Sequence, residues 1–302
     1  MKGDAVLLIG GGFIGAALAR QLGAIDRPLH VLTRRPASAD FPPLYWHRGD
    51  LQDRELLARL LPDCKTVVHL ASETTPGSSA RHPTLEAGNL LPTLGLLEVL
   101  QDFPDIHLIY FSSGGTLYGN PAVLPVAEDA PFAPLSFHGA GKAAQEMYLQ
   151  AFRAQGRSVT ILRPANAYGP GQQLKNGFGL VRTMLEHIRR NTVLEVWGDG
   201  TAVRDYVYVD DVAAACVRFV DQPGDNGSYN VGSGSGHSIS ELIRCVNAVC
   251  SRELQVAYRP ARRSDVAQVV LDISQLRATG WQPRIDLAEG LRRTWAWLQG
   301  QP

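Results

Sequence analysis

A short glycine cluster is the first feature whose spacing points to chemistry. Gly10, Gly12 and Gly15 follow an apolar run at residues 5–9 and form the pattern G-x-G-x-x-G. Glycines at these places allow a tight turn, a close approach of the backbone to a pyrophosphate, and close packing of the next helix on the strand. Phosphate would then lie at the N-terminus of that helix. Because a second strand is expected about twenty residues further on, the cluster predicts dinucleotide binding rather than a merely structural turn.

The end of that second expected strand carries Thr33, Arg34 and Arg35. An acidic residue at this place accepts hydrogen bonds from the ribose of NAD, whereas an arginine accommodates the 2′-phosphate of NADP. Arg34 therefore favours NADP, unless both arginines are solvated loop residues and the ribose is held by other groups. Asp50 and Leu51 follow the next short strand and are candidates for contact with the adenine. The alternative for Asp50 is that it caps the helix after it.

Two other kinds of site find no support in the sequence. Ser112 and Ser113 lack the Gly-x-Ser-x-Gly pattern of a hydrolase nucleophile. The histidines outside position 138 form no ligand cluster with Asp, Glu or Cys, so we predict no metal site. The four cysteines match neither a metal knuckle nor a disulfide scaffold, which predicts reduced thiols in a cytoplasmic protein.

Strand-like and helix-like segments, which must position these residues, alternate through the first two thirds of the chain. Unbroken apolar runs predict strands buried on both faces at residues 5–9, 29–33, 66–70, 108–112 and 159–162. Apolar residues three and four apart predict amphipathic helices at residues 13–22, 53–61, 85–101 and 140–154. The alternation predicts an α/β fold of Rossmann type, with a doubly wound parallel sheet.

The regular alternation of predicted strands and helices ends after residue 168. Helix-like segments at 181–190, 239–250 and 287–298 and a strand at 206–209 predict a smaller C-terminal α/β lobe. We expect residues 1–168 to form the dinucleotide-binding domain, to which later segments return, and residues 169–302 to form mainly the substrate lobe. Because no long linker separates the two, we expect a cleft between packed lobes.

Composition excludes several classes of protein. The 302 residues carry 29 Lys+Arg and 29 Asp+Glu, so no electrostatic footprint for nucleic acid or for an anionic membrane is visible. Hydrophobic residues make up 45% and charged residues 19%, which predicts a large core rather than disorder. An apolar stretch at residues 5–19 ends like a secretory signal, but three glycines interrupt it and it is shorter than the ~20 residues of a membrane helix. We expect neither a signal peptide nor a membrane span.

Seven ordered landmarks give the chain a family resemblance. They lie at residues 49–51 (Gly-Asp-Leu), 69–71 (His-Leu-Ala), 89 (Asn), 111–119, 163–171, 198–200 (Gly-Asp-Gly) and 204–211. With them, nearly the whole chain resembles the extended short-chain dehydrogenase/reductases, in the branch of nucleotide-sugar epimerases and dehydratases that includes UDP-glucose 4-epimerase. The resemblance implies a nicotinamide cofactor, NAD in most of the branch, and a UDP-sugar substrate.

The resemblance also implies roles for individual residues. The cofactor would contact Gly10, Gly12, Phe13, Ile14, Gly15, Thr33, Arg34, Asp50, Leu51, Leu70, Ala71, Ser72, Asn89, Lys142 and Pro164. Within this set, Lys142 would hold the nicotinamide ribose. The substrate would contact Asn166, Arg204, Arg262 and Asp265. The planar fork of an arginine can grip diphosphate oxygens with two hydrogen bonds, which suits Arg204 and Arg262 to this role.

Two departures from the family pattern fall on the expected catalytic residues. The family uses a Tyr-x-x-x-Lys pair on one helix face as its general base, and here His138 stands in place of the tyrosine, four residues before Lys142. Gly114 occupies the usual Ser/Thr position, which leaves Ser113 and Thr116 as hydroxyl helpers, with Thr116 preferred. Imidazole can act as an acid and a base near neutral pH, but it is shorter than a phenol and must reach the substrate hydroxyl. Three possibilities stay open: a working base, a weakened substitute, or a site that has lost hydride chemistry.

Three functions compete on this basis. The first is a UDP-hexose 4-epimerase that works through a transient 4-keto sugar, with His138 as base and acid. The second is an NADP-linked reductase or dehydrogenase of a nucleotide sugar, supported by Arg34. The third is a catalytically weakened or non-catalytic NAD(P)-binding protein, against which Asn166, Arg204 and Arg262 argue. A dehydratase is disfavoured because Gly115 and Thr116 replace the Asp-Glu pair of the dehydratases.

The resemblance further implies a homodimer. Its interface would be a four-helix bundle built from the helices expected at residues 85–101 and 140–154. Burial of the same helices against the chain's own sheet would produce the same apolar pattern.

Overall fold

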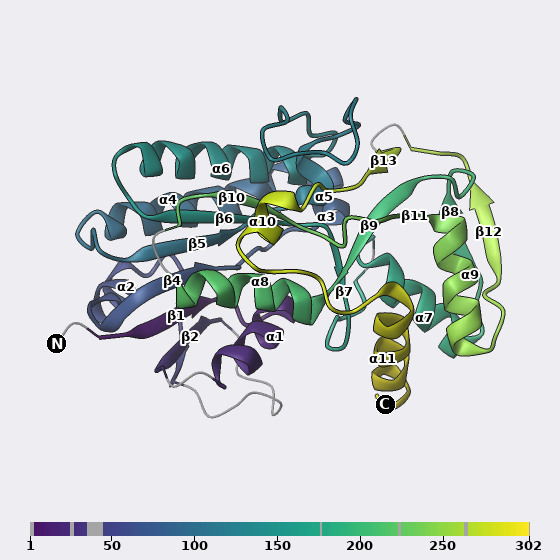
Figure 1. The fold of residues 1–302 in the computed structure, drawn as a ribbon, viewed down its shortest axis with the longest axis horizontal. Coiled ribbons are helices and arrows are strands. Elements are labelled where there is room, and N and C mark those ends of the chain that lie inside the picture. Colours follow the sequence, from purple (N-terminus) through teal and green to yellow (C-terminus); the bar gives the residue numbers. More distant parts are fainter. Residues whose placement is uncertain are drawn as a thin grey trace.

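The central element of the fold is a seven-stranded parallel sheet (Figure 1). The structure is a computed structural model that describes residues 3–24, 27–34, 45–175, 177–222, 225–262 and 265–301. The strands lie in the order β10-β6-β5-β4-β1-β2-β3. In chain order they are β1 (Ala5–Ile9), β2 (Leu29–Thr33), β3 (Tyr45–Arg48), β4 (Cys64–His69), β5 (His107–Phe111), β6 (Val159–Pro164) and β10 (Ser228–Val231). Every residue of β1, β5 and β6 is buried, as expected of strands covered on both faces.

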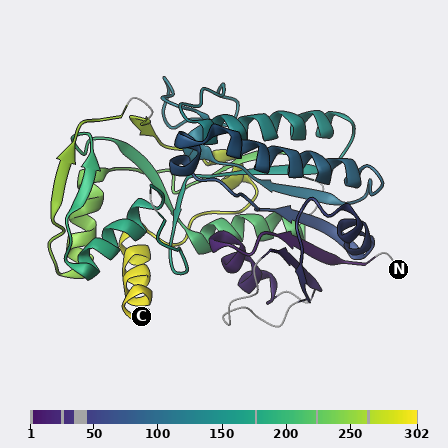
Figure 2. The same cartoon turned by 180° about the vertical axis from the view of Figure 1, so that it is seen from behind.

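Helices cover both faces of this sheet. On one face, α1 (Phe13–Leu22) packs against α8 (Val209–Asp221). On the other face lie α2 (Arg54–Leu60), α4 (Ala87–Leu100) and α6 (Phe137–Ala154), with α4 and α6 side by side (Figure 2). Alternate strand residues feed two separate cores: Val6 and Leu8 belong to the core under α1 and α8, while Leu7 and Ile9 belong to the core under α4 and α6. The period of two along a strand explains this division.

The direction in which the strands are added reverses between β1 and β4. The chain builds outward through β2 and β3 on one side, then crosses to β4, β5 and β6 on the other. At such a switch point the loops after the two strands diverge and leave a crevice at the carboxyl edge of the sheet. The glycine cluster after β1 and the residues after β4 therefore lie at this crevice.

A second group of elements forms a smaller lobe. It contains β7 (Asn166–Tyr168), β9 (Val203–Tyr208), β11 (Gly236–Ser238) and β13 (Gln268–Val269) in one sheet, and β8 (Leu194–Trp197) paired with β12 (Val256–Arg259) in another. Three helices, α7 (Leu180–Arg190), α9 (Ile239–Cys250) and α11 (Leu287–Gln299), pack around a third hydrophobic core. Figure 1 places this lobe, with the C-terminus, at the end of the molecule away from the N-terminus.

Short helices complete the chain between the larger elements. They are η1 (Leu61–Asp63), α3 (Pro76–Arg81), η2 (Pro83–Glu86), α5 (Gly114–Leu117) and α10 (Ser274–Ala278). Thr75 caps α3 and Ser136 caps α6, each side-chain oxygen accepting a backbone N–H inside the first turn.

The predicted fold class is confirmed, and the element bounds agree closely. The segments predicted at 5–9, 13–22, 29–33 and 239–250 have the bounds of β1, α1, β2 and α9. The helix predicted to begin at residue 140 begins at Phe137, because Ser136 supplies a cap that the apolar periodicity does not reveal. The short strands β7, β8 and β11 to β13, and β10 in the large sheet, were not predicted. Along the ranges that the structure describes, no helix combines the length and the apolar character needed to cross a membrane.

Candidate active site

A cleft of about 1210 Å³ lies at the carboxyl edge of the large sheet and extends to the second lobe. Among its lining residues are sixteen that the sequence singled out: Gly10, Gly12, Phe13, Ile14, Gly15, Leu70, Ser72, Ser113, Thr116, His138, Lys142, Pro164, Asn166, Arg204, Arg262 and Asp265. Thr33, Arg34, Asp50, Leu51, Ala71 and Asn89 are not part of this lining. The tertiary structure thus brings residues from the ends of four strands of the large sheet, from helix α6 and from the second lobe to one cavity.

The glycine cluster has the geometry that a dinucleotide needs. Gly10 has a φ of +111°, and a Cβ there would lie 2.8 Å from the backbone N of Ala71. A Cβ on Gly15 would lie 2.1 Å from the carbonyl O of Gly10, so helix α1 can pack this closely only without a side chain. Gly12, the N-cap residue of α1, has nothing within 4 Å of its Cβ position, and no side chain caps the helix. The first amides of α1 therefore face open space, as a pyrophosphate site requires.

Arg34 is held by two carboxylates at the end of β2. Its guanidinium forms an ion pair with Glu73 and lies 3.9 Å from Asp50 (Nη1 to Oδ2). Asp50 does not cap helix α2: its Oδ1 accepts from the backbone N of Gln52, and Asp53 is the cap residue. The alternative that Asp50 is an N-cap is therefore wrong. Arg35 lies outside the described residues.

The two carboxylates change what Arg34 indicates. A 2′-phosphate beside Arg34 would also approach Glu73 and Asp50, and like charges this close repel. The arrangement therefore suits ribose hydroxyls better than a phosphate. Nothing in the sequence pattern brings Glu73 to Arg34, because they follow different strands.

Asn89 and Leu51, expected to contact the cofactor, lie outside the cleft lining. Asn89, on α4, accepts a hydrogen bond from the backbone N of Glu73 at 2.8 Å and donates to Thr74 Oγ1 at 2.7 Å. Asn89 thereby fixes the segment after β4. Leu51 is 8% exposed and belongs to the core under α4 and α6.

Lys142 is buried at the bottom of the cleft. Its Nζ donates to the hydroxyl of Tyr110 at 3.1 Å and to the carbonyl O of Phe111 at 2.9 Å. Burial lowers the pKa of Lys142 to about 8, although the nearby carboxylates of Glu86 and Glu146 oppose this shift. The ammonium group is thus pinned at the end of β5 while its residue lines the cleft.

His138 lies in the first turn of α6, the helix that also carries Lys142, and contacts two polar side chains in the wall of the cleft. Its Nδ1 lies 3.1 Å from Thr74 Oγ1 and 3.5 Å from Glu86 Oε1. In the part of the chain that the structure describes, no protein group forms a hydrogen bond with Nε2. Because the residue lines the cleft, Nε2 is the nitrogen available to a ligand.

The expected hydroxyl helpers lie at the start of the short helix α5 and within it. Ser113 is its N-cap residue, and Thr116 Oγ1 lies 3.5 Å from the carbonyl O of Ser113. A Cβ on Gly114 would lie 2.6 Å from Leu271 Cδ1 and 2.8 Å from the carbonyl O of Arg163. The chain therefore has no room for a serine or threonine at position 114 unless its neighbours shift, which leaves Ser113 and Thr116 as the candidate hydroxyls.

The residues expected to bind substrate line the part of the cleft beyond Pro164. Arg204, in β9, donates to the carbonyl O of Val203 at 2.8 Å and to that of Val266, and burial lowers its pKa. Arg262 stacks over the ring of Trp197, with its guanidinium carbon 3.8 Å from the ring centre. Asp265 is exposed, while Arg263 and Ser264 lie outside the described residues.

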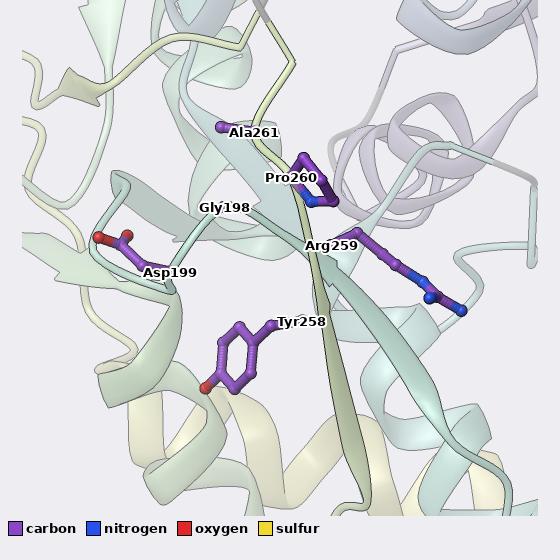
Figure 3. Close-up of a pocket in the computed structure, with 6 residues that line it drawn as sticks. All are labelled: Gly198, Asp199, Tyr258, Arg259, Pro260 and Ala261. Atoms are coloured by element: carbon purple, nitrogen blue, oxygen red, sulfur yellow. The ribbon is translucent and has the colours of Figure 1, made fainter.

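A separate open pocket of about 580 Å³ lies on the second lobe. Its lining consists of Gly198, Asp199, Tyr258, Arg259, Pro260 and Ala261 (Figure 3). In Figure 3 the Arg259 side chain points away from Asp199, and it pairs with Glu195 at 2.7 Å. None of the titratable residues of the large cleft reaches this pocket, so we assign the chemistry to the large cleft.

Comparison with known proteins identifies the family. The model of the NAD dependent epimerase/dehydratase family matches residues 6–232. The chain belongs to this family. A putative UDP-glucose 4-epimerase of Methanocaldococcus jannaschii is 30% identical over 301 residues, which cover 97% of this chain and 98% of that protein.

Two solved structures of family members have the same fold. The UDP-glucose 4-epimerase of Thermotoga maritima, solved with UDP-glucose, has a TM-score of 0.91 and 31% identity, covering 98% of each chain. The UDP-glucose 4-epimerase of Thermus thermophilus, solved with NAD, has a TM-score of 0.90 and 32% identity, covering 98% of this chain and 99% of that one. Both relatives are thus UDP-glucose 4-epimerases, one in complex with UDP-glucose and the other with NAD.

Four polar residues around the cleft were not identified from the sequence. Glu73 pairs with Arg34, Tyr110 binds Lys142, and Thr74 and Glu86 contact His138. Tyr110 lies one residue before the end of β5 and Thr74 follows β4, and positions near the carboxyl ends of buried strands could have marked them. Glu86 carries no such signal. Within the described ranges, no group of three or more His, Cys, Asp or Glu side chains could hold a metal ion.

Proposed function

We propose that this protein is an epimerase that interconverts the C4 epimers of a UDP-hexose with a tightly bound NAD. The observation that carries the proposal is one cleft that holds a dinucleotide turn, a buried Lys142 and the available Nε2 of His138. When bound, NAD would take a hydride from C4 of the sugar and later return it to the other face. The sugar would rotate between the two transfers.

The chain's own residues supply binding, orientation and proton transfer. His138 would take the proton of the C4 hydroxyl and give it back, as a general base and then a general acid. Thr116 or Ser113 would orient that hydroxyl. Lys142 would hold the nicotinamide ribose, with its ammonium fixed by Tyr110.

The second lobe would bind the UDP moiety. Arg204 and Arg262 would contact the diphosphate and Asn166 would contact the sugar side of it. Asp265 would accept a hydrogen bond from the nucleotide ribose. The guanidinium of Arg262 already lies over the ring of Trp197, which limits the orientations of its fork.

Charge at the adenosine end supports NAD over NADP. Arg34 is engaged by Glu73 and lies near Asp50, so a 2′-phosphate would meet two carboxylates. This arrangement removes the main support for an NADP-linked reductase, whose turnover would consume NADPH stoichiometrically.

The decisive experiment uses the purified protein without added cofactor. UDP-glucose and UDP-N-acetylglucosamine are each supplied, and proton NMR follows the configuration at C4. Conversion by the wild type, with NAD released on denaturation, supports the proposal. Conversion by His138→Tyr alone would mean that the scaffold is competent but His138 is not. If neither the wild type nor His138→Tyr converts these sugars, the proposal is contradicted for them. NADPH consumption with 4-keto sugars would then be tested.

We also propose a homodimer located in the cytoplasm. Large apolar side chains are exposed on α4 and α6, among them Leu91 (62%), Met147 (65%) and Tyr148 (48%). Large exposed apolar side chains on two adjacent helices are typical of an interface. The cysteines Cys64, Cys216, Cys245 and Cys250 are free, which supports a reducing compartment.

A further inference from the structure

The carboxylate of Glu86 lies beside the imidazole of His138, although the two residues are far apart in the sequence. Glu86 ends η2 and is the N-cap residue of α4, whereas His138 lies in the first turn of α6. Both side chains are largely buried, with exposed fractions of 13% and 9%. The helix dipole favours a negative charge at the start of α4. The family's tyrosine would not need such a partner, because a phenol has a single titratable oxygen.

The carboxylate of Glu86 favours a proton on Nδ1 of His138. Asn89 Nδ2 donates to Thr74 Oγ1, and the orientation of this amide follows from its Oδ1, which accepts from the backbone N of Glu73. The Thr74 hydroxyl, 3.1 Å from Nδ1, can either donate or accept there. The Glu86 carboxylate, whose Oε1 lies 3.5 Å from Nδ1, can only accept. A proton on Nδ1 therefore faces the carboxylate, and the lone pair of the neutral ring is then at Nε2.

Glu86 is kept ionised by its neighbours. Burial alone would raise the pKa of its carboxyl, but hydrogen bonds from His138 and from three other side chains outweigh burial and lower the pKa to about 2. Two of these donors are Ser79 and Asn89 Nδ2, the latter at 3.0 Å from Oε2. The carboxylate therefore carries a full negative charge at the pH values at which the protein would work.

A glycine in α6 makes room for the carboxylate. A Cβ on Gly141 would lie 2.5 Å from Glu86 Oε2 and 3.0 Å from Glu86 Cδ. Glycine is a poor residue for the interior of a helix. Its place one turn after His138, opposite Glu86, lets the carboxylate approach the helix that carries the imidazole.

We infer that Glu86 is a positioning residue for the proton transfer, which holds His138 as the Nδ1–H tautomer and stabilises the imidazolium that forms when Nε2 takes a proton. The chemical consequence rests on the proposed function. In that reaction the O–H bond at C4 breaks and an N–H bond forms at Nε2. The electron pair left on oxygen forms the C=O bond as hydride leaves C4 for the oxidised nicotinamide. The reverse transfers restore the hydroxyl and the neutral ring.

Two variants separate this role from folding. Glu86→Gln removes the charge but keeps the shape, and Gly141→Ala improves helix propensity while displacing the carboxylate. We expect each to lower kcat about 100-fold with little change in KM, a loss in the range of general-base effects. Glu98→Gln, the same substitution at an exposed ion pair with Arg54, is the matched control and keeps the wild-type kcat.

A spectroscopic readout tests the tautomer without turnover. In ¹⁵N-histidine-labelled protein, assigned by comparison with His138→Gln, we expect His138 to be protonated at Nδ1 in the wild type and to lose this preference in Glu86→Gln. An Nε2–H tautomer in the wild type, or a wild-type kcat in Glu86→Gln, would overturn the inference. If the wild type epimerises neither sugar, the proposed function fails, while the tautomer still decides the role of Glu86 toward His138.

Discussion

The Nζ atom of Lys142 lies 3.1 Å from the hydroxyl of Tyr110 and 4.8 Å from the centre of the Tyr110 ring. Tyr110 is fully buried, and burial raises the pKa of its phenol well above the ordinary value. The phenol therefore stays neutral, and its oxygen can accept from the ammonium group. Tyr110 and the carbonyl O of Phe111 occupy two of the three donors of Lys142, and the third is available toward the cleft.

Replacing Lys142 by Met should remove the proposed contact of Lys142 with the nicotinamide ribose without unfolding the protein. Methionine fills a similar volume and needs no hydrogen bond at this buried position. We expect the content of copurified NAD to fall and kcat to drop at least about 100-fold, the scale of a lost general acid–base arrangement. Content of NAD is measured after denaturation. A variant with wild-type NAD content and wild-type kcat would contradict the role of Lys142.

The lowered pKa of Lys142 predicts a pH dependence. The ammonium is charged below a pH of about 8 and loses its proton as the pH rises through that value, so activity should decline on the alkaline side of 8. Between about 8 and the ordinary value of 10.5, the unfolded chain binds more protons than the folded chain. The contribution of Lys142 to the free energy of unfolding should therefore rise with pH in this window. Lys142→Met should show neither the alkaline decline in its pH–rate profile nor the rise in the free energy of unfolding in denaturation experiments.

Cofactor preference should depend on the carboxylates around Arg34. We expect the wild type to bind NAD at least about tenfold more tightly than NADP, a difference of about 1.4 kcal/mol. Glu73→Gln should reduce the preference for NAD over NADP, because it removes a charge that repels a 2′-phosphate and frees Arg34 to bind that phosphate. Calorimetric titration of cofactor-free protein measures both affinities. Tighter binding of NADP by the wild type would restore the reductase hypothesis.

Gly114→Ser should destabilise the protein rather than restore a catalytic hydroxyl. Its Cβ would approach Leu271 Cδ1 to 2.6 Å and the backbone O of Arg163 to 2.8 Å. Overpacking of this kind typically costs about 1–3 kcal/mol, which denaturant unfolding can detect. Gly300→Ser is the control, because a Cβ there comes no closer than 3.5 Å to the nearest atom named, Trp297 O. Higher activity in Gly114→Ser would show that the cleft can accept the extra hydroxyl.

Glu146→Gln should reduce stability more than any exposed charge substitution. Arg163 and Glu146 are 2% and 0% exposed and share three hydrogen bonds of 2.7 to 3.1 Å. Removal of one partner leaves a buried arginine without its counterion, which costs about 3–5 kcal/mol. Chemical denaturation of the variant beside Glu98→Gln measures the difference. A loss below about 1 kcal/mol would mean that solvent reaches Arg163.

Met147→Glu should separate the proposed dimer into monomers. Met147 is 65% exposed on α6 and would place a charge in an apolar interface with α4 and α6 of a second copy. Sedimentation velocity should give a mass of two chains for the wild type and one chain for the variant. A wild-type mass of one chain, 32.8 kDa, would rule out the dimer.

The fold class, the dinucleotide turn and sixteen residues of the cleft lining could be predicted from the sequence. These features depend on local patterns: apolar periodicity sets strands and helices, and glycines at fixed offsets set the turn after β1. The position of His138 and Lys142 on one helix face also follows from local spacing.

The surroundings of these residues depend on packing between segments that are far apart in the sequence. In the sequence Arg34 favoured NADP. The structure changes this interpretation because β4 and β2 lie on the two sides of β1, and the segment after β4 brings Glu73 to Arg34. Glu86 reaches His138 because η2 and α6 pack together, and no local spacing encodes that contact. Charges and protonation depend on neighbours in space, and in a parallel sheet those neighbours come from distant segments of the chain.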